Sequence, residues 1–232
     1  MKQSVLGLLT FLCLLTGCTT RNSDDAVVAT VRSLEPSVVL LTMRIPPDRK
    51  SDKYDEAYAT GTVVATGIWG SDILTVQHAI DHAWHLYVTV GNHRKYPATV
   101  VAQNTNIDVA LVRTRIGPLP VATLGSSVHL SHDIGRVIGL LGYPVPDEFD
   151  YESLGLATSF NSGFLSSLRK DALEVTLTIV PGESGAPVFI ADTGEIIGIA
   201  DSRFDDEHSI GFAVPIDDAK HFLHKCNMAH GF

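Results

Sequence analysis

The chain is short of positive charge. Lysine and arginine number 17 against 26 aspartates and glutamates, which gives a formal net charge of −9 over 232 residues. No basic cluster compensates locally, and binding to a phosphate backbone needs concentrated positive charge. The composition therefore argues against nucleic acid as a partner. Charged residues make up only 19% of the chain and no long polar or repetitive tract occurs, so disorder is expected only in short ends and loops.

Long hydrophobic runs are also missing. An apolar run over residues 5–15 follows the positively charged Lys2, and it is too short for a comfortable membrane-spanning helix. Residues 15–18 (LTGC) resemble the bacterial lipoprotein signal, in which cleavage before the cysteine is coupled to its lipidation. The resemblance predicts a signal peptide over 1–17, a lipidated Cys18, a tether over 18–25, and membrane anchoring in the bacterial cell envelope. An ordinary secretory peptide or a retained anchor is the alternative.

Cysteine is scarce, with three in the whole chain. Cys13 lies in the predicted signal peptide and Cys18 is the predicted lipid site, which leaves Cys226 alone near the C-terminus. A disulfide within the domain is then not available, although an exported location would permit one. Packing must supply the stability, and a hydrophobic content of 45% is enough for one sizeable domain or two small packed barrels.

Short β-branched runs separated by glycine, proline or polar clusters dominate the pattern, which is typical of an all-β barrel or sandwich. Helices are expected only near the ends, over 24–34 and 217–228, where acidic residues open each run. The Gly-Pro-Leu-Pro break at 117–120 predicts a junction between two halves. The expected strands are 38–43, 62–66, 72–76, 86–90, 98–102, 109–113, 137–141, 172–179, 186–190, 195–200 and 210–214.

Ser184 lies in a Gly-x-Ser-Gly turn between apolar runs. Glycines at 182 and 185 permit a tight turn that a Cβ would obstruct. Such a turn can aim consecutive backbone N–H groups at one point beside the hydroxyl, as an oxyanion hole requires. The string alone is weak evidence, because chance turns supply many. It gains weight from a candidate base and its orienting acid upstream.

His78 and Asp108 are those candidates. His78 ends an apolar strand, and Asp108 follows a polar stretch and precedes the run at 109–112. Serine needs an adjacent base at neutral pH, and the base needs a carboxylate that fixes its tautomer and stabilises the imidazolium. A lone histidine or a lone aspartate before a strand is usually structural. The order His, Asp, Ser is the one used by chymotrypsin-type enzymes, and the conjunction favours a triad.

The chain resembles trypsin-like serine proteases of the bacterial HtrA/Deg type over about residues 26–222. The resemblance implies an all-β fold of two packed six-stranded barrels of the chymotrypsin type, over about 26–120 and 121–216, with a C-terminal helix over about 217–228 in a protease domain spanning 26–232. It implies that His78 and Asp108 come from the first barrel and Ser184 from the second. The matching segments are 36–39, 60–64, 74–80, 108–112, 182–187 and 210–215.

The resemblance also implies a function, namely peptide-bond hydrolysis through an acyl-enzyme, with no cofactor or metal and with exported or unfolded polypeptides as substrates. The backbone N–H groups of Gly182 and Ser184 would form the oxyanion hole. A small apolar pocket would favour small or aliphatic side chains before the scissile bond. The expected substrate-binding residues are Thr178, Ile179, Ile199, Ala200 and Asp201.

Glu183 and Ala186 depart from the family pattern, which usually has Asn or Asp before the serine and a further glycine after it. These departures keep open a catalytically silent binding module as the alternative function. Metal ligation by His78, His82 and His85 is a further alternative, as is an esterase of the same chemistry, although the G-x-S-x-G elbow is missing. No PDZ domain is expected after the terminal helix, and the oligomeric state is left open.

Overall fold

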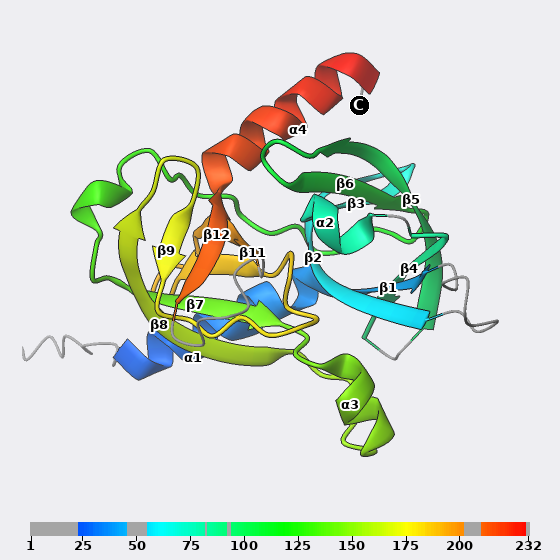
Figure 1. The fold of residues 1–232 in the computed structure, drawn as a ribbon, viewed down its shortest axis with the longest axis horizontal. Helices are drawn as coiled ribbons and strands as arrows, with labels where there is room; N and C mark the ends of the chain where they lie inside the picture. The colour runs from blue at the N-terminus through cyan, green and yellow to red at the C-terminus, as the bar shows by residue number, and fades with distance from the viewer. Residues whose placement is uncertain (1–22, 46–54, 82, 92–93, 202–209, 231–232) are drawn as a thin grey trace, which may run out of the picture.

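The computed structural model describes residues 23–45, 55–81, 83–91, 94–201 and 210–230, and it places two β-barrels side by side (Figure 1). The first is closed in the order β1-β2-β3-β6-β5-β4, and neighbouring strands are antiparallel. The predicted all-β fold of two six-stranded barrels is confirmed. The strands of the first barrel are β1 (Val38–Ile45), β2 (Asp55–Gly67), β3 (Gly70–Thr75), β4 (His85–Val90), β5 (Arg94–Asn104) and β6 (Val109–Thr114).

The second barrel repeats this architecture. It is closed in the order β10-β11-β12-β9-β8-β7, again through antiparallel neighbours. The segment between the barrels contains Leu124, which forms an isolated parallel bridge with Ile196 of the second barrel. The strands of the second barrel are β7 (Val137–Gly142), β8 (Ser159–Leu168), β9 (Leu173–Val175), β10 (Pro187–Ile190), β11 (Ile196–Asp201) and β12 (Gly211–Pro215).

The apolar side chains form a core inside each barrel and a third cluster between them. This third cluster joins Leu74 and Leu111 of the first barrel to Phe189 and Ile199 of the second. Because these side chains are almost fully buried, the hydrophobic effect holds the barrels in one relative placement. Residues at the rim of this contact are therefore positioned by both barrels.

Helices are few and lie outside the barrels. Helix α1 (Ser23–Leu34) precedes the first barrel in sequence, yet Thr30 contacts the turn at Gly194 in the second. Helix α4 (Ile216–His230) packs Phe222 and Cys226 into the cluster between the barrels. In the described part of the chain, no helix combines the length and apolarity needed to cross a bilayer. The remaining helices are η1 (Glu35–Ser37), α2 (Gln77–Ile80), η2 (Leu130–His132) and α3 (Pro146–Tyr151).

Two strands of the second barrel differ from the sequence-based expectation. Strand β8 was not predicted, because its sequence SFNSGFLSSL is rich in serine and contains no β-branched residue. Pairing with β7 and β9 makes it a strand nonetheless. The run at 172–179 was predicted as one strand, but β9 ends at Val175. Beyond it, the Thr176 N–H still donates to the carbonyl of Phe164 in β8 at 3.0 Å, and the chain then continues into the loop that carries Ser184.

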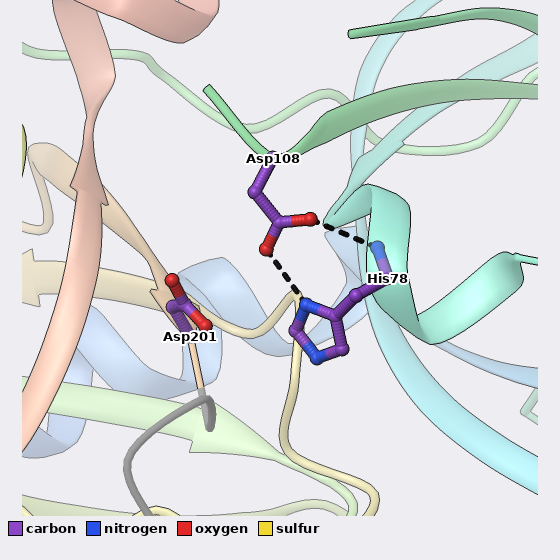
Figure 2. A group of neighbouring side chains, drawn as sticks. All are labelled: His78, Asp108 and Asp201. Carbon is purple, nitrogen blue, oxygen red and sulfur yellow. Dashed lines mark hydrogen bonds and ion pairs between the residues drawn. The ribbon is translucent and has the colours of Figure 1, made fainter. Parts of the chain in front are cut away.

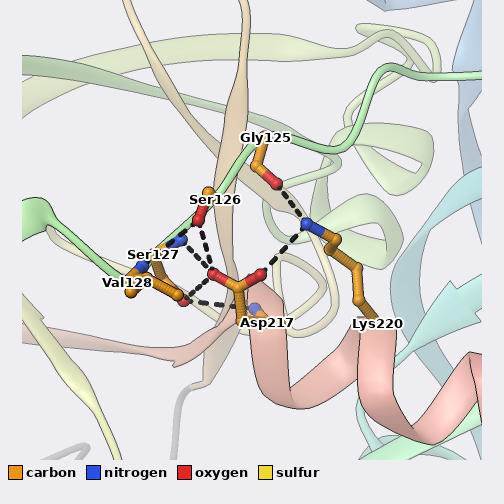
Figure 3. A network of polar contacts seen from close by, with 6 residues as sticks. All are labelled: Gly125, Ser126, Ser127, Val128, Asp217 and Lys220. Carbon is orange, nitrogen blue, oxygen red and sulfur yellow. Dashed lines mark hydrogen bonds and ion pairs between the residues drawn. The ribbon is translucent and has the colours of Figure 1, made fainter.

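Asp217 fastens α4 to the segment between the barrels (Figure 3). Its carboxylate accepts hydrogen bonds from the backbone N–H of Ser127, from the hydroxyls of Ser126 and Ser127, and from Lys220 Nζ at 3.0 Å. Lys220 also donates to the carbonyl of Gly125. Partial burial alone would raise the pKa of Asp217, but these bonds, led by the Ser127 N–H, hold it well below its usual value.

We therefore expect Asp217→Asn to lower the free energy of unfolding by ~1–2 kcal/mol at neutral pH, since it removes charge-assisted bonds. A depressed folded-state pKa contributes stability above the unfolded value of about 3.9, and this contribution is lost as the pH falls below that value. Urea unfolding at pH 7 and pH 3 should show the gap to wild type narrowing on acidification. Asp218→Asn, at the exposed neighbouring position, is the control and should leave stability unchanged.

Candidate active site

His78 and Asp108 meet at the rim of the contact between the barrels (Figure 2). His78 lies in α2, directly after β3, and Asp108 directly precedes β6, the strand that pairs with β3. Asp108 Oδ1 accepts the backbone N–H of His78 at 2.9 Å, and Oδ2 lies 2.7 Å from His78 Nδ1. A carboxylate only accepts, so Nδ1 carries the proton and Nε2 is the basic nitrogen. The histidine has the tautomer that a general base needs.

The backbone at Asp108 is strained in a way that serves this pairing. Its φ is +52°, in the left-handed region that few residues other than glycine adopt, although aspartate tolerates it best. The Asp108 carbonyl accepts the N–H of Gln77 at 3.3 Å. Asp108 is only 2% exposed, whereas the His78 side chain is 33% exposed. The carboxylate is thus shielded, while the imidazole remains accessible to a substrate.

Ser184 lies in the tight loop between β9 and β10. Gly182 and Gly185, on either side, have φ of +93° and +89°. A Cβ at residue 182 would lie 2.3 Å from the Tyr143 carbonyl oxygen, and one at residue 185 would lie 2.1 Å from that of Thr60. The prediction that a Cβ would obstruct this turn is therefore confirmed at both positions. Only glycine fits the backbone and the space together.

The Ser184 loop is bound to both barrels. Gly185 N–H donates to the Ala200 carbonyl in β11 at 2.9 Å. On the other side, a Cβ at residue 185 would lie 2.2 Å from the hydroxyl of Thr75, the last residue of β3. Thr75 precedes His78 by three positions. The loop with Ser184 thus rests against the end of β3, the strand that leads into His78.

Thr60 belongs to this site, although it was given no role from the sequence. Its N–H donates to the Ser184 carbonyl at 2.9 Å, and its hydroxyl donates to the Gly182 carbonyl at 2.7 Å. The same hydroxyl accepts the N–H of Tyr143 at 3.0 Å. Thr60 is fully buried in β2, so it holds the Ser184 loop of one barrel from the wall of the other. From the sequence, Thr60 was included only as the first residue of the segment 60–64 that resembles the family.

Glu183 finds a partner within its own turn. Its carboxylate accepts the N–H of Val180 at 2.9 Å, and its backbone N–H donates to the Val180 carbonyl at 3.0 Å. Burial raises the pKa of Glu183, and the Val180 hydrogen bond opposes this rise only in part. The glutamate that departs from the family pattern therefore closes the 180–183 turn from inside.

The expected substrate-binding residues occupy three different environments. Thr178 is exposed and Ile179 half-buried, and a Cβ on Gly211 would lie 3.0 Å from Ile179 Cδ1. Ile199 is buried in the cluster between the barrels and Ala200 in the second barrel's core, so both side chains serve packing. Of the histidines considered as alternative metal ligands, His82 lies outside the described residues and His85 is exposed at the start of β4. Cys18, the predicted lipidation site, also lies outside the described residues.

Asp201, expected to be a substrate-binding residue, lies beside the His78–Asp108 pair. It ends β11 and is 3% exposed. One of its carboxylate oxygens lies within 4.8 Å of both a ring nitrogen of His78 and a carboxylate oxygen of Asp108 (Figure 2). The second barrel therefore contributes a buried acid beside the pair from the first. Its position in sequence, between an apolar strand and residues 202–209, gave no sign of this orientation.

Comparison with known proteins agrees with the geometry. A family model described as a trypsin-like peptidase domain matches residues 59–199, which include His78, Asp108 and Ser184. A probable periplasmic serine endoprotease DegP-like of Halomonas elongata is 30% identical, covering 63% of this chain and 31% of the relative. The putative serine protease HhoA of Synechocystis is 33% identical, covering 64% of this chain and 38% of the relative. The chain thus spans about a third of the length of these relatives.

A solved structure gives the same answer for the fold. The crystal structure of the serine endoprotease from Yersinia pestis is similar with a TM-score of 0.68 at 26% identity, covering 86% of this chain and 66% of that one. The resemblance to HtrA/Deg proteases is thereby supported by sequence relatives and by three-dimensional similarity. The chain belongs to the trypsin-like peptidase domain family, and a serine protease is the enzyme class that this membership supports.

Proposed function

We propose that the chain is a serine endopeptidase that uses Ser184 as nucleophile, His78 as general base and Asp108 as the group that orients the histidine. The observation that carries the proposal is the pair of hydrogen bonds that Asp108 accepts from His78, one from the backbone N–H and one from Nδ1, which leaves Nε2 as the basic nitrogen. Beside it, the Ser184 loop is held by glycines that nothing larger can replace. Positioned base, orienting acid and nucleophile loop are the parts that acyl transfer requires.

The mechanism follows from these roles. His78 Nε2 removes the proton as the Ser184 hydroxyl attacks the peptide carbonyl, and Asp108 stabilises the resulting imidazolium. The N–H groups of Gly182 and Ser184 would stabilise the oxyanion, and one such donor is worth ~3 kcal/mol of barrier. His78 then protonates the leaving amine. Water, activated by the same histidine, hydrolyses the acyl-enzyme and restores Ser184.

Substrate preference is proposed from the residues that lie near Ser184. Ile179, five positions before Ser184, packs against Gly211, where a Cβ would lie 3.0 Å from its Cδ1. An apolar surface of this kind suits small or aliphatic side chains better than long cationic ones. Two DegP-like relatives are named periplasmic endoproteases, which supports exported polypeptides as substrates and the cell envelope as location. Lipidation of Cys18, with membrane anchoring, stays part of this proposal.

Cleavage of an unfolded protein tests the proposal. The purified full chain should cut reduced, alkylated casein, and mass spectrometry of the products should show internal cuts after small or aliphatic residues. Ser184→Ala should yield no products above background. If wild type and Ser184→Ala both left the substrate intact while retaining the β-rich fold by circular dichroism, the alternative of a silent binding module would replace the proposal.

A further inference from the structure

Asp201 adds a second carboxylate to the His78–Asp108 pair. It comes from β11 of the second barrel, whereas His78 and Asp108 belong to the first (Figure 2). Ligand atoms of the three side chains all lie within 4.8 Å of one another, and both aspartates are almost fully buried. Two acids and one imidazole therefore share a small volume that water reaches mainly from the histidine side.

Other charges that face this cluster in the described chain are few. Strands β10 and β12, which pair with β11, contain no charged side chain. Helix α4 contributes Ala219 and Phe222 to the apolar cluster between the barrels, while its Asp217 and Lys220 are bonded to residues 125–127. On β3 and β6, Asp72 and Arg113 form an ion pair with each other.

Among the described side chains of this cluster, His78 is therefore the one that can become cationic. A carboxylate within about 4–6 Å of an imidazole favours the charged form, and a low-dielectric surrounding strengthens that effect. When His78 takes up the serine proton, its positive charge lies beside both carboxyl groups, and this attraction is present only as the reaction proceeds. Interactions that strengthen during the reaction accelerate it.

We propose that Asp201 is a positioning and electrostatic residue of the reaction, a second acid that stabilises the His78 imidazolium and sets the pH below which the protease is inactive. The inference rests on the proposed function, because it assigns His78 as the base. The same stabilisation that helps His78 accept the serine proton also makes free His78 protonate at higher pH. Asp201 therefore increases kcat/KM near neutral pH and decreases it at acidic pH.

The test is the pH profile of kcat/KM for Asp201→Asn, which keeps the shape of the side chain and removes its charge. The acidic limb should move about one unit to lower pH, and the plateau should fall several-fold. Asp192→Asn is the matched control, because it removes an exposed carboxylate before the opposite end of β11. Its limb should coincide with that of wild type. A limb that stays in place, or moves upward, in folded Asp201→Asn would overturn the inference.

Two further measurements keep the inference separate from folding and from the proposed function. If Asp201→Asn does not fold, Asp201→Ser provides a smaller side chain without charge, and the same downward shift is expected. If wild type shows no peptidase activity, the proposed function fails. The NMR titration of the His78 ring protons then decides the inference alone: its midpoint should drop in Asp201→Asn, and an unchanged midpoint would contradict it.

Discussion

Asp108→Asn should lower kcat/KM by about 10⁴-fold without unfolding the protein. Asp108 accepts two hydrogen bonds from His78, one from the backbone N–H and one from Nδ1. An asparagine amide has one oxygen and one NH₂ group. The backbone N–H can only donate, so the amide oxygen must stay there and the NH₂ group must face Nδ1. Nδ1 then becomes the acceptor, the ring proton moves to Nε2, and His78 is no longer a base toward Ser184.

Steady-state peptidase kinetics and thermal unfolding measure this prediction. His78→Ala should show a loss of similar size, and the double variant should be little worse than either single variant, because residues that act as a unit are strongly non-additive. Asp108→Asn should unfold within a few degrees of wild type. Activity within tenfold of wild type would mean that the Asp108–His78 bond does not govern the reaction.

Gly185→Ala should destabilise the chain by at least ~3 kcal/mol and lower kcat/KM more than ~100-fold. Gly185 has a φ of +89°, and a Cβ there would lie 2.1 Å from the Thr60 carbonyl oxygen and 2.2 Å from the Thr75 hydroxyl. Both obstacles belong to the first barrel. The added methyl group must push the Ser184 loop away from the strand end that leads into His78, which breaks the alignment of nucleophile and base.

Gly135→Ala is the matched control. Gly135 also has a φ of +89°, but among the described residues beyond its two chain neighbours no atom lies within 4 Å of the position of its Cβ. This variant carries the backbone strain alone, so it should lose ~1–2 kcal/mol and keep full activity. The free energy of unfolding and kcat/KM of the two variants separate the effect of backbone strain from that of the steric clash of the added methyl group. Equal stability and equal activity of the two alanine variants would contradict the close fit of the Ser184 loop against the first barrel.

Much of the fold could be predicted from the sequence. Barrel strands either alternate apolar and polar residues or consist of buried β-branched residues, and they end at turns. Strands β3, β6 and β10 follow that rule and were predicted within about two residues at each end. Strand β8 breaks it, since serines, asparagine and glycine form a strand only because β7 and β9 offer ladder partners. Pairing across long sequence separations overrides local preference, and a single sequence does not reveal it.

The candidate site was likewise predicted only in part. His78, Asp108 and Ser184 could be proposed as a triad from the sequence, because each follows or precedes an apolar strand and they occur in the expected order. Thr60 was given no role from the sequence and Asp201 was expected only to bind substrate, because the contacts that define both residues form between the barrels. Thr60 is bonded to residues more than 120 positions away, and Asp201 faces a histidine from another barrel. Only the three-dimensional structure assigns such residues.

Covalent labelling of Ser184 is the sharpest test of the proposed triad. The purified full chain is incubated with a fluorophosphonate, which reacts with serines activated by a neighbouring base, and the adduct is located by peptide mapping. Ser184 should be modified stoichiometrically in wild type, and modification should be strongly reduced in His78→Ala and Asp108→Asn. An unmodified Ser184 in the folded wild-type protein, or equal labelling in His78→Ala, would mean that His78 does not activate Ser184.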